Sequence, residues 1–492
     1  MRWQINDLYN WFSDFYLFKI ILNKFIFLFR IIINSVKFAA NLILNTIKMK
    51  NNIFLAAISA CLILASCSGD GEEPVVVPGV VDCNGVEDGT SMVDDCGDCQ
   101  QAYIYDVVSH QVQLLDDTMG VTLGMTEILV MPNDPTNPYW NAGCIPVPST
   151  YTFDRMGQST VSFGGQTARL QMAIELYGAF STASEAELLE MYNDGTGFSD
   201  PALNASGKKL GNKTAAYHYS SLVKPMFDAM LSKQANVVMP AVNAGTIAAP
   251  GVAGSYTGVG GRTVKVDEKG FELNQTFIKG MIGALCVDQM VNGYLSPTKL
   301  DPASNDVSGL GAGEYTTMEH YWDEGFGYLY GLEADITAPT YSGNGSVLLN
   351  KYAGKVNTSG DVDMNAVYNA LIAGRTAIVN MDYTERDAQG LIARAHISKI
   401  LGVKASDYLR GGAAGLADPN NVDMAEVIHD LSEGYGFILS LQFAVGLDGQ
   451  YLVPKADVDN MLANLEAGNG LWDVDAATLI TMADQIDAIF NY

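Results

Sequence analysis

The sequence has 492 residues, of which 28 are basic and 55 acidic, and its formal net charge is −27 at pH 7. Seven basic and two acidic side chains lie within residues 1–66, so residues 67–492 carry 21 basic and 53 acidic ones. This acidic surplus argues against nucleic acid as a partner, and the length after residue 66 is enough for one large domain or two ordinary ones.

An apolar segment, residues 53–65, follows a basic residue at Lys50 and ends in the motif Leu-Ala-Ser-Cys at Cys67. A short basic start, an apolar middle and small residues at the end are typical of a secretory signal. The segment is shorter than the roughly 20 apolar residues that a membrane-spanning helix needs. The final motif indicates a lipobox, in which cleavage leaves a cysteine that is linked to diacylglycerol. We therefore expect a lipoprotein signal peptide over residues 49–66 and membrane attachment through Cys67.

Residues 1–48 do not have the pattern of a signal peptide. Lys24, Arg30 and Lys37 interrupt every apolar stretch that could span a membrane, and each such charge costs roughly 2.5–3.5 kcal/mol at the centre of a spanning helix. We interpret this stretch as the product of a mis-assigned start codon, with translation beginning at Met49.

Residues 67–82 begin Cys-Ser-Gly-Asp-Gly-Glu-Glu and continue through a stretch rich in Val and Pro. The acidic start resembles the export tag that follows the lipid cysteine in surface lipoproteins of some Gram-negative bacteria. An acidic, Pro-containing segment also serves as a solvated tether. These features favour an outer-membrane lipoprotein exposed on the cell surface, and a periplasm-facing position is the alternative.

Four of the seven cysteines cluster in a predicted spacer, residues 83–147. In an exported chain they predict two disulfides whose pairing the sequence leaves open, and they are Cys83, Cys96, Cys99 and Cys144. Cys286 lies alone in an apolar helical pattern, and we expect it to be a buried apolar residue. Weak alternation of apolar residues predicts short strands between residues 103 and 165, ending in a small hairpin over residues 151–163.

Acidic and amide side chains alternate with glycines around the first three of these cysteines. The arrangement resembles the short D-C-x-G…D-x-C-G-x-C repeats of exported bacterial proteins, which are similar to calcium-binding loops. This resemblance implies calcium bound by oxygen ligands at Asp82, Asn84, Asp88, Asp94 and Asp98. Glu87 stands where a further cysteine commonly follows, and the alternative is a disulfide-stabilised spacer without metal.

From about residue 166 onward, apolar residues recur with the period of an α-helix. After a first helix that includes residues 169–176, we expect helices near residues 184–192, 211–233, 271–295, 315–331, 363–381, 384–402, 422–445, 455–466 and 475–490. The longest intervening loop, residues 241–270, has no phosphate-binding motif. The sequence thus predicts a mostly α fold, a duplicated helical bundle over residues 148–492 that follows a small disulfide-stabilised segment with short strands.

One motif occurs twice in this bundle, as His-x-x-x-Glu-Gly-aromatic-Gly-aromatic at residues 320–328 and 429–437. Each copy follows a helix ending in Tyr-Leu, which indicates duplicated helical units. Inside a helix each glycine costs about 1 kcal/mol relative to Ala, so we expect another group to approach the backbone closely there. Residues three or four apart share a helix face, and the candidate site residues on these faces are His320, Glu324, Glu426, His429 and Glu433.

These five residues allow two interpretations. If the two units pack face to face around a pseudo-twofold axis, their imidazoles and carboxylates meet in the interior and bind a divalent metal or a small ligand. Alternatively, each Glu accepts a hydrogen bond from its His, and the pairs hold helices together. Glu426 and His429 form the only Glu-x-x-His pair, so a four-carboxylate di-iron set is incomplete.

The chain from residue 151 onward resembles a family of exported lipoproteins whose domain has no assigned function. The resemblance rests on Tyr-Thr-Phe at 151–153, Gly-Gln-x-x-Arg-Leu-x-Met at 165–172, Gln-x-x-x-Lys-Gly at 275–280 and Met-Glu-His-x-Trp-Asp-Glu-Gly-Phe-Gly at 318–327. More distantly, the duplicated helical domain is similar to imelysin-like proteins, which include proposed peptidases and iron-uptake components. Their Gly-x-His-x-x-Glu motif is absent, so none of their site residues carries over.

We therefore expect a lipid-anchored binding module for a metal, a metal complex or a small solute. One alternative is an imelysin-like metal-dependent peptidase with Glu324 or Glu433 as its base, and another is a structural or protein-docking lipoprotein. Neither His-Glu-x-x-His nor Gly-x-Ser-x-Gly occurs, so no motif identifies a reaction. The expected partners are the membrane, through Cys67, and an unidentified small ligand or surface protein.

Overall fold

The computed structural model describes residues 81–87, 89–93, 99–106, 112–115, 118, 120–132, 145–418, 420 and 422–490. The predicted signal peptide, the lipid-carrying Cys67 and nearly all of the tether lie outside these ranges. Five of the candidate calcium ligands and disulfide cysteines of the predicted spacer also lie outside these ranges, and they are Asp88, Asp94, Cys96, Asp98 and Cys144. The described residues are mostly helical, which confirms the predicted fold class. None of their helices is both long and apolar enough to cross a membrane.

The spacer contains short antiparallel strands and one disulfide. Strand β1 (Met92–Val93) pairs with β2 (Cys99–Gln100), and β3 (Ala102–Asp106) lies between β4 (Val112–Leu115) and β5 (Glu127–Val130). Tyr105 of β3 is opposite Val112 on one side and Ile128 on the other. Cys83 is bonded to Cys99, so the structure provides one pairing that the sequence had left open.

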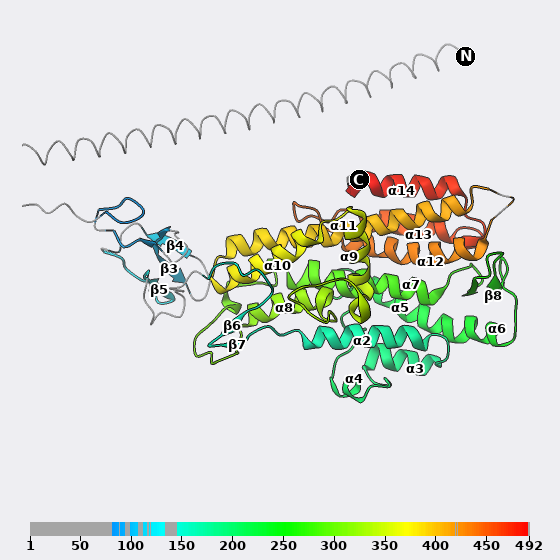
Figure 1. The fold of residues 1–492 in the computed structure, drawn as a ribbon, viewed down its shortest axis with the longest axis horizontal. Helices are drawn as coiled ribbons and strands as arrows, with labels where there is room; N and C mark the ends of the chain where they lie inside the picture. Colours follow the sequence, from blue (N-terminus) through cyan, green and yellow to red (C-terminus); the bar gives the residue numbers. More distant parts are fainter. Residues whose placement is uncertain are drawn as a thin grey trace, which may run out of the picture. The chain divides into compact units, whose positions relative to one another are not determined.

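From residue 164 onward the described chain is mostly helical (Figure 1). The first group is α2 (Gly164–Ala179), α3 (Glu185–Leu189), η1 (Glu190–Asp194), α4 (Pro201–Ala205), α5 (Ser220–Lys233), η2 (Gln234–Val238) and α6 (Met239–Asn243). The central group is α7 (Leu273–Met281), η3 (Ile282–Tyr294), η4 (Pro302–Ser304), α8 (Thr317–Tyr330) and η5 (Gly343–Gly345). The last group is α9 (Leu348–Ser359), α10 (Met364–Val379), α11 (Tyr383–Gly415), α12 (Met424–Ser440), η6 (Leu441–Phe443), α13 (Lys455–Glu466), η7 (Gly470–Trp472) and α14 (Ala476–Phe490).

The predicted hairpin over residues 151–163 is present but shorter, as β6 (Asp154–Arg155) paired with β7 (Gln158–Ser159). The expected loop over residues 241–270 contains a second hairpin, formed by β8 (Gly254–Thr257) and β9 (Thr263–Val266). In β9 the valines are buried and Thr263 and Lys265 are exposed, which is the alternation of a half-buried strand. This hairpin was not predicted, because each strand is only four residues long and lies between glycine-containing turns.

Several helices also differ from expectation, since α4 was not predicted and α5 begins at Ser220 instead of near residue 211. Helix α9 was not predicted, although its buried apolar residues recur at helical spacing. Helix α11 continues past residue 402 to Gly415, through glycines that are typical of a helix end. Tertiary contact explains one of them, because a methyl group on Gly412 would lie 2.5 Å from Leu431 Cδ2 of α12. The glycines let α11 and α12 pack closely.

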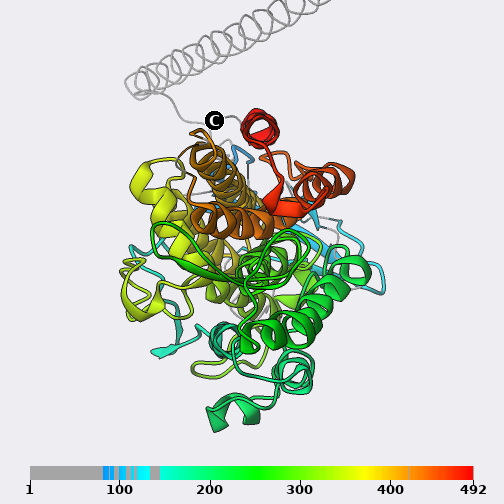
Figure 2. The same ribbon diagram turned by 90° about the vertical axis from the view of Figure 1, so that its right-hand side faces the viewer.

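The helix formed by α7 and η3 lies at the centre of the helical domain and is almost entirely buried. Helix α12 packs along α7, whereas α8 packs mainly along η3. Helix α2 contacts both α7 and α8, and the C-terminal helices α13 and α14 lie against α12 and α11 respectively (Figures 1 and 2). The two copies of the His/Glu motif, on α8 and α12, therefore contact different halves of one central helix.

Candidate functional site

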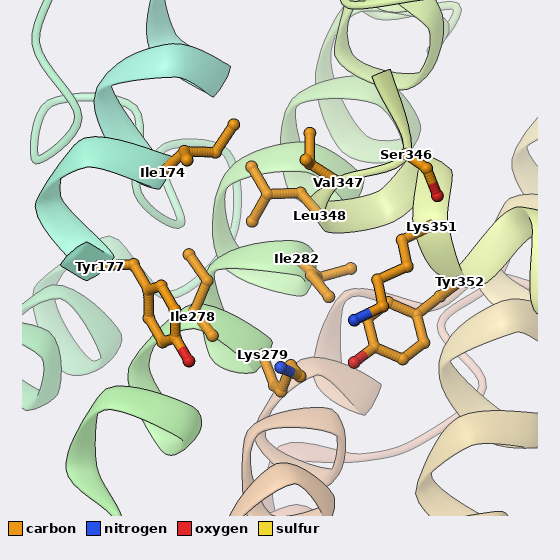
Figure 3. Close-up of a pocket in the computed structure, with 10 residues that line it drawn as sticks. All are labelled: Ile174, Tyr177, Ile278, Lys279, Ile282, Ser346, Val347, Leu348, Lys351 and Tyr352. Carbon is orange, nitrogen blue, oxygen red and sulfur yellow. The ribbon is translucent and has the colours of Figure 1, made fainter. Parts of the chain in front are cut away.

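A pocket of about 240 Å³ lies between α2, α7, η3 and the start of α9. Figure 3 shows its lining, with Lys279 between Tyr177 on one side and Tyr352 on the other. The residues that line it are Ile174, Tyr177, Ile278, Lys279, Ile282, Ser346, Val347, Leu348, Lys351 and Tyr352. Small-molecule pockets combine mostly apolar walls with a few polar groups and measure about 300–1,000 Å³, so this one suits a small solute.

Lys279 is the charged group on the pocket lining that lies deepest in the fold, with 7% of its surface exposed. Its ammonium donates to Gln275 Oε1, one helical turn earlier, at 3.0 Å and pairs with Glu433 Oε1 of α12 at 3.0 Å. Burial lowers the pKa of Lys279, and the Glu433 carboxylate offsets this only in part. Burial alone would raise the pKa of Glu433, but the ammonium of Lys279 above all holds it below its usual value.

The second copy of the His/Glu motif contacts this lysine through Glu433. His429 Nδ1 is 2.7 Å from Glu272 Oε2, and its Nε2 is 3.6 Å from Glu433 Oε1. The Tyr352 hydroxyl donates to Glu433 Oε2 at 3.3 Å. A continuous polar network thus runs from the pocket wall at Tyr352, through Glu433 and His429, to Glu272 at the start of α7.

The two glycines of this motif copy allow the close contact that forms the network. A methyl group on Gly436 would lie 2.5 Å from Lys279 Cβ and 2.7 Å from the backbone nitrogen of Gly280. One on Gly434 would lie 3.1 Å from Tyr408 Cβ of α11. The expected close approach to the backbone is therefore present, and the approaching groups are neighbouring helices.

The first motif copy has different partners. His320 Nε2 is 4.0 Å from Glu324 Oε1, and that carboxylate accepts a hydrogen bond from Gln166 Nε2 of α2 at 2.8 Å. The His320 ring stacks on Tyr315, with 4.8 Å between the ring centres. Its second glycine, Gly327, faces α2, since a methyl group there would lie 2.5 Å from Phe163 Cβ.

The structure does not bring the five predicted site residues together. Glu426 pairs with Arg262 at 2.7 Å, with half of its side chain exposed. Each of the other two carboxylates is held by a helix outside its own motif copy, Glu324 by α2 and Glu433 by α7. Within the described ranges, no group of three or more His, Cys, Asp or Glu side chains is arranged to hold a metal ion. A metal at these residues stays a prediction.

Sequence reasoning missed the residues that surround Glu433, namely Lys279, Tyr352 and Glu272. One signal was available, because Lys279 is the only charged residue between Glu272 and Asp288 in an otherwise apolar run.

The predicted calcium ligands of the spacer are described only in part. Asp82 Oδ1 accepts the backbone N–H groups of Asn84 and Val86, and its Oδ2 accepts that of Ser91, each at 2.9 Å. The bond from Val86 above all holds the pKa of Asp82 below its usual value. Asp82 therefore closes a turn beside the disulfide, and calcium binding at this loop stays a prediction.

A protein-family model described as "Domain of unknown function (DUF4856)" matches residues 148–492. The pocket and both motif copies lie inside this range. No curated protein and no solved structure matches the chain.

Proposed function

The chain belongs to the DUF4856 family of domains of unknown function, and we propose that it is a lipid-anchored binding protein that holds a small amphipathic acid in the pocket beside Lys279. The observation that carries this proposal is a buried ammonium group in a pocket whose walls are largely apolar. Five of the ten lining residues are aliphatic and would contact the apolar body of the solute, and they are Ile174, Ile278, Ile282, Val347 and Leu348.

The charge around the pocket favours an acidic group on the solute. The ammonium groups of Lys279, Lys351 and Lys355 lie 5.7, 5.7 and 5.1 Å from the centre of the Tyr352 ring. Only Lys279 has an ion-pair partner within 4 Å among the described residues. Glu433 balances one of the three charges, so the two exposed lysines, Lys351 and Lys355, leave a net positive charge that attracts a carboxylate of the solute.

The same charges disfavour a metal ion at this position. Glu433 is already paired with Lys279 at 3.0 Å, so a divalent cation would have to displace that ammonium. It would also lie close to Lys351, whose positive charge already lowers the pKa of Lys279. Of the ligand classes expected from the sequence, the small solute is the one that the arrangement supports best.

The anchoring part of the proposal rests on the sequence. The lipobox at Cys67 and the acidic tether over residues 67–82 support attachment to the outer membrane with the helical domain facing outward. In that position the protein would capture its solute at the cell surface. The predicted spacer, residues 83–147, would separate the pocket from the bilayer.

Calorimetric titration of the full-length protein in detergent with acetate, butyrate, hexanoate and octanoate tests the pocket. We expect affinity to rise with chain length until the cavity is filled, because each buried methylene contributes about 0.8 kcal/mol. Lys279→Met should weaken binding of the best acid at least tenfold, and Ile282→Trp should abolish it by filling the cavity. Lys455→Met removes a lysine that pairs with Asp459 at the surface and should leave binding unchanged. Equal affinity in all four proteins would refute the proposal.

A further inference from the structure

Four cationic side chains gather around the first motif copy, away from the pocket beside Lys279. No ion pair within 4 Å involves any of them among the residues that the structure describes, and they are Arg169, Lys208, Lys213 and Lys299. The adjacent Lys209, in contrast, pairs with Asp194 at 3.8 Å. In a chain with nearly twice as many acidic as basic residues, four neighbouring cations without a carboxylate partner need an explanation.

Two of the four flank one glycine at the start of α2. A methyl group on Gly165 would lie 3.4 Å from Lys208 Nζ and 3.5 Å from Arg169 Nη1. The Arg169 guanidinium is fixed in place, because it donates to the backbone carbonyls of Gly165 at 3.3 Å and Lys209 at 3.1 Å. A rigid guanidinium and an ammonium group are therefore held side by side.

The other two lie on a group of tyrosines beside α8. Lys213 Nζ donates to the Tyr294 hydroxyl at 3.1 Å, and Lys299 Nζ lies 3.9 Å from the centre of the Tyr321 ring. The two rings are themselves 6.1 Å apart. These contacts place both ammonium groups against one aromatic surface.

The two pairs of cations are close enough to affect each other's charge, and buried polar atoms without hydrogen-bond partners in the described chain lie among them. Burial lowers the pKa of Lys213, and the positive charges of Arg169, Lys299 and Lys208 lower it further, against the opposing effect of Glu324. The Tyr328 hydroxyl, whose ring stacks 6.2 Å from that of Tyr294, is buried without a hydrogen-bond partner among the described residues. Gln166 Oε1 is also buried without a partner there. Such unpaired groups are uncommon inside proteins and often mark a missing water or ligand.

From this arrangement we propose that the first motif copy forms a second binding site, which takes a multiply charged oxyanion of the phosphate type. Among the described residues whose charges act on Lys213, Glu324 is the one carboxylate. The local charge is therefore close to +3 and matches a dianion or trianion better than a monocarboxylate. Arg169 offers the planar donor pattern that suits phosphate oxygens. The lysines add charge, and the Tyr328 hydroxyl adds a donor.

This site is independent of the pocket beside Lys279. In the second motif copy Lys279 pairs with Glu433 at 3.0 Å. In the first copy Glu324 accepts a hydrogen bond from Gln166, and the four cations have no ion-pair partner within 4 Å among the described residues. The two motif copies thus provide two places for anions of different charge.

Titration of the full-length protein with inorganic phosphate and with soluble dihexanoyl phosphatidate, below its micelle concentration, tests the second site. We expect phosphate to bind the wild-type protein and the Lys208→Met/Lys213→Met variant to bind it at least tenfold more weakly. Lys209→Met, next in the chain but ion-paired, is the matched control and should bind like wild type. Tighter binding of phosphatidate than of phosphate identifies a lipid headgroup as the source of the anion, and equal binding identifies free phosphate.

Two further results make the test decisive. Lys208→Met alone changes a partly exposed side chain, so it keeps the test valid if the double variant does not fold, and it should weaken phosphate binding severalfold. Lys279→Met should leave phosphate binding intact, which separates this site from the proposed pocket. Absence of phosphate binding to the wild type, or its loss in Lys279→Met but not in Lys208→Met/Lys213→Met, would overturn the inference.

Discussion

Lys279 Nζ and Glu433 Oε1 lie 3.0 Å apart between α7 and α12, with 9% and 10% of their side chains exposed. Neither partner has easy access to water, so each depends on the other for compensation of its charge. The pair also joins the pocket lining to the His429–Glu272 contact. The pair therefore links two helices, and its lysine lines the proposed binding pocket.

Breaking this pair from one side should destabilise the fold. Lys279→Met leaves the Glu433 carboxylate buried, and uncompensated buried charges cost about 3–5 kcal/mol. The double variant Lys279→Met/Glu433→Gln removes both charges and should recover most of that loss. Urea unfolding of the three proteins measures the difference, and a single variant as stable as wild type would show that the pair contributes nothing.

The close helix contact at Gly436 predicts a second effect. Gly436→Ala would place a methyl group 2.5 Å from Lys279 Cβ and 2.7 Å from the Gly280 backbone nitrogen, and overpacking of this kind typically costs about 1–3 kcal/mol. The matched control is Gly178→Ala in α2, where a methyl group meets nothing within 4 Å and where helix propensity should raise the free energy of unfolding by about 0.5–1 kcal/mol. Thermal unfolding should move in opposite directions for the two variants, and shifts of the same sign would argue against this packing.

Arg375 anchors the helix that carries the first motif copy. Its fully buried guanidinium lies 2.9 Å from Glu319 Oε1 and 3.1 Å from Asp323 Oδ1 of α8. Arg375→Met should lower the free energy of unfolding by about 3–5 kcal/mol, because two buried carboxylates lose their main counter-charge. Arg410 pairs with Asp484 and Asp487 in a largely exposed setting, and Arg410→Met should cost at most about 1 kcal/mol. Equal losses in denaturant unfolding would contradict this difference.

Asp288, at the centre of η3, predicts a pH dependence of stability. Burial raises the pKa of its carboxyl to about 7, against the lowering effect of hydrogen bonds from the Tyr217 N–H and the Asn292 amide. Between pH 3.8, the usual pKa of an aspartate carboxyl, and about pH 7, the folded state then binds a proton that the unfolded state has released. This contribution to stability is complete at low pH, falls as the pH rises through that interval, and is lost above it.

Asp288→Asn should remove this slope. At pH 8 the variant should be more stable than wild type by up to a few kcal/mol, since one pKa unit corresponds to about 1.4 kcal/mol, and at pH 4 the two should be similar. Free energies of unfolding measured from pH 4 to pH 8 test this. A variant that is less stable than wild type at pH 8 would show that the carboxylate, and not the carboxylic acid, is the favoured form in the fold.

Much of the helical architecture could be predicted, because apolar periodicity and terminal residues act locally. Helix α13 has the bounds that were expected, and α14 differs by one residue. The helix expected over residues 384–402 was too short, since α11 continues to Gly415 through glycines such as Gly412, whose small size serves contact with Leu431. The hairpin of β8 and β9 was missed because four alternating residues carry little signal.

The sequence by itself determined that this protein is mostly helical and that one His/Glu motif is duplicated, since both are properties of residues close together in the chain. Only the tertiary structure decided which groups neutralise the two motif carboxylates. Glu324 accepts a hydrogen bond from Gln166 of α2 and lies near cations that have no ion-pair partner among the described residues, whereas Glu433 forms an ion pair with Lys279 of α7. The physical reason is that a buried charge takes its partner from whichever helix packs against it, and that packing depends on contacts between distant parts of the chain.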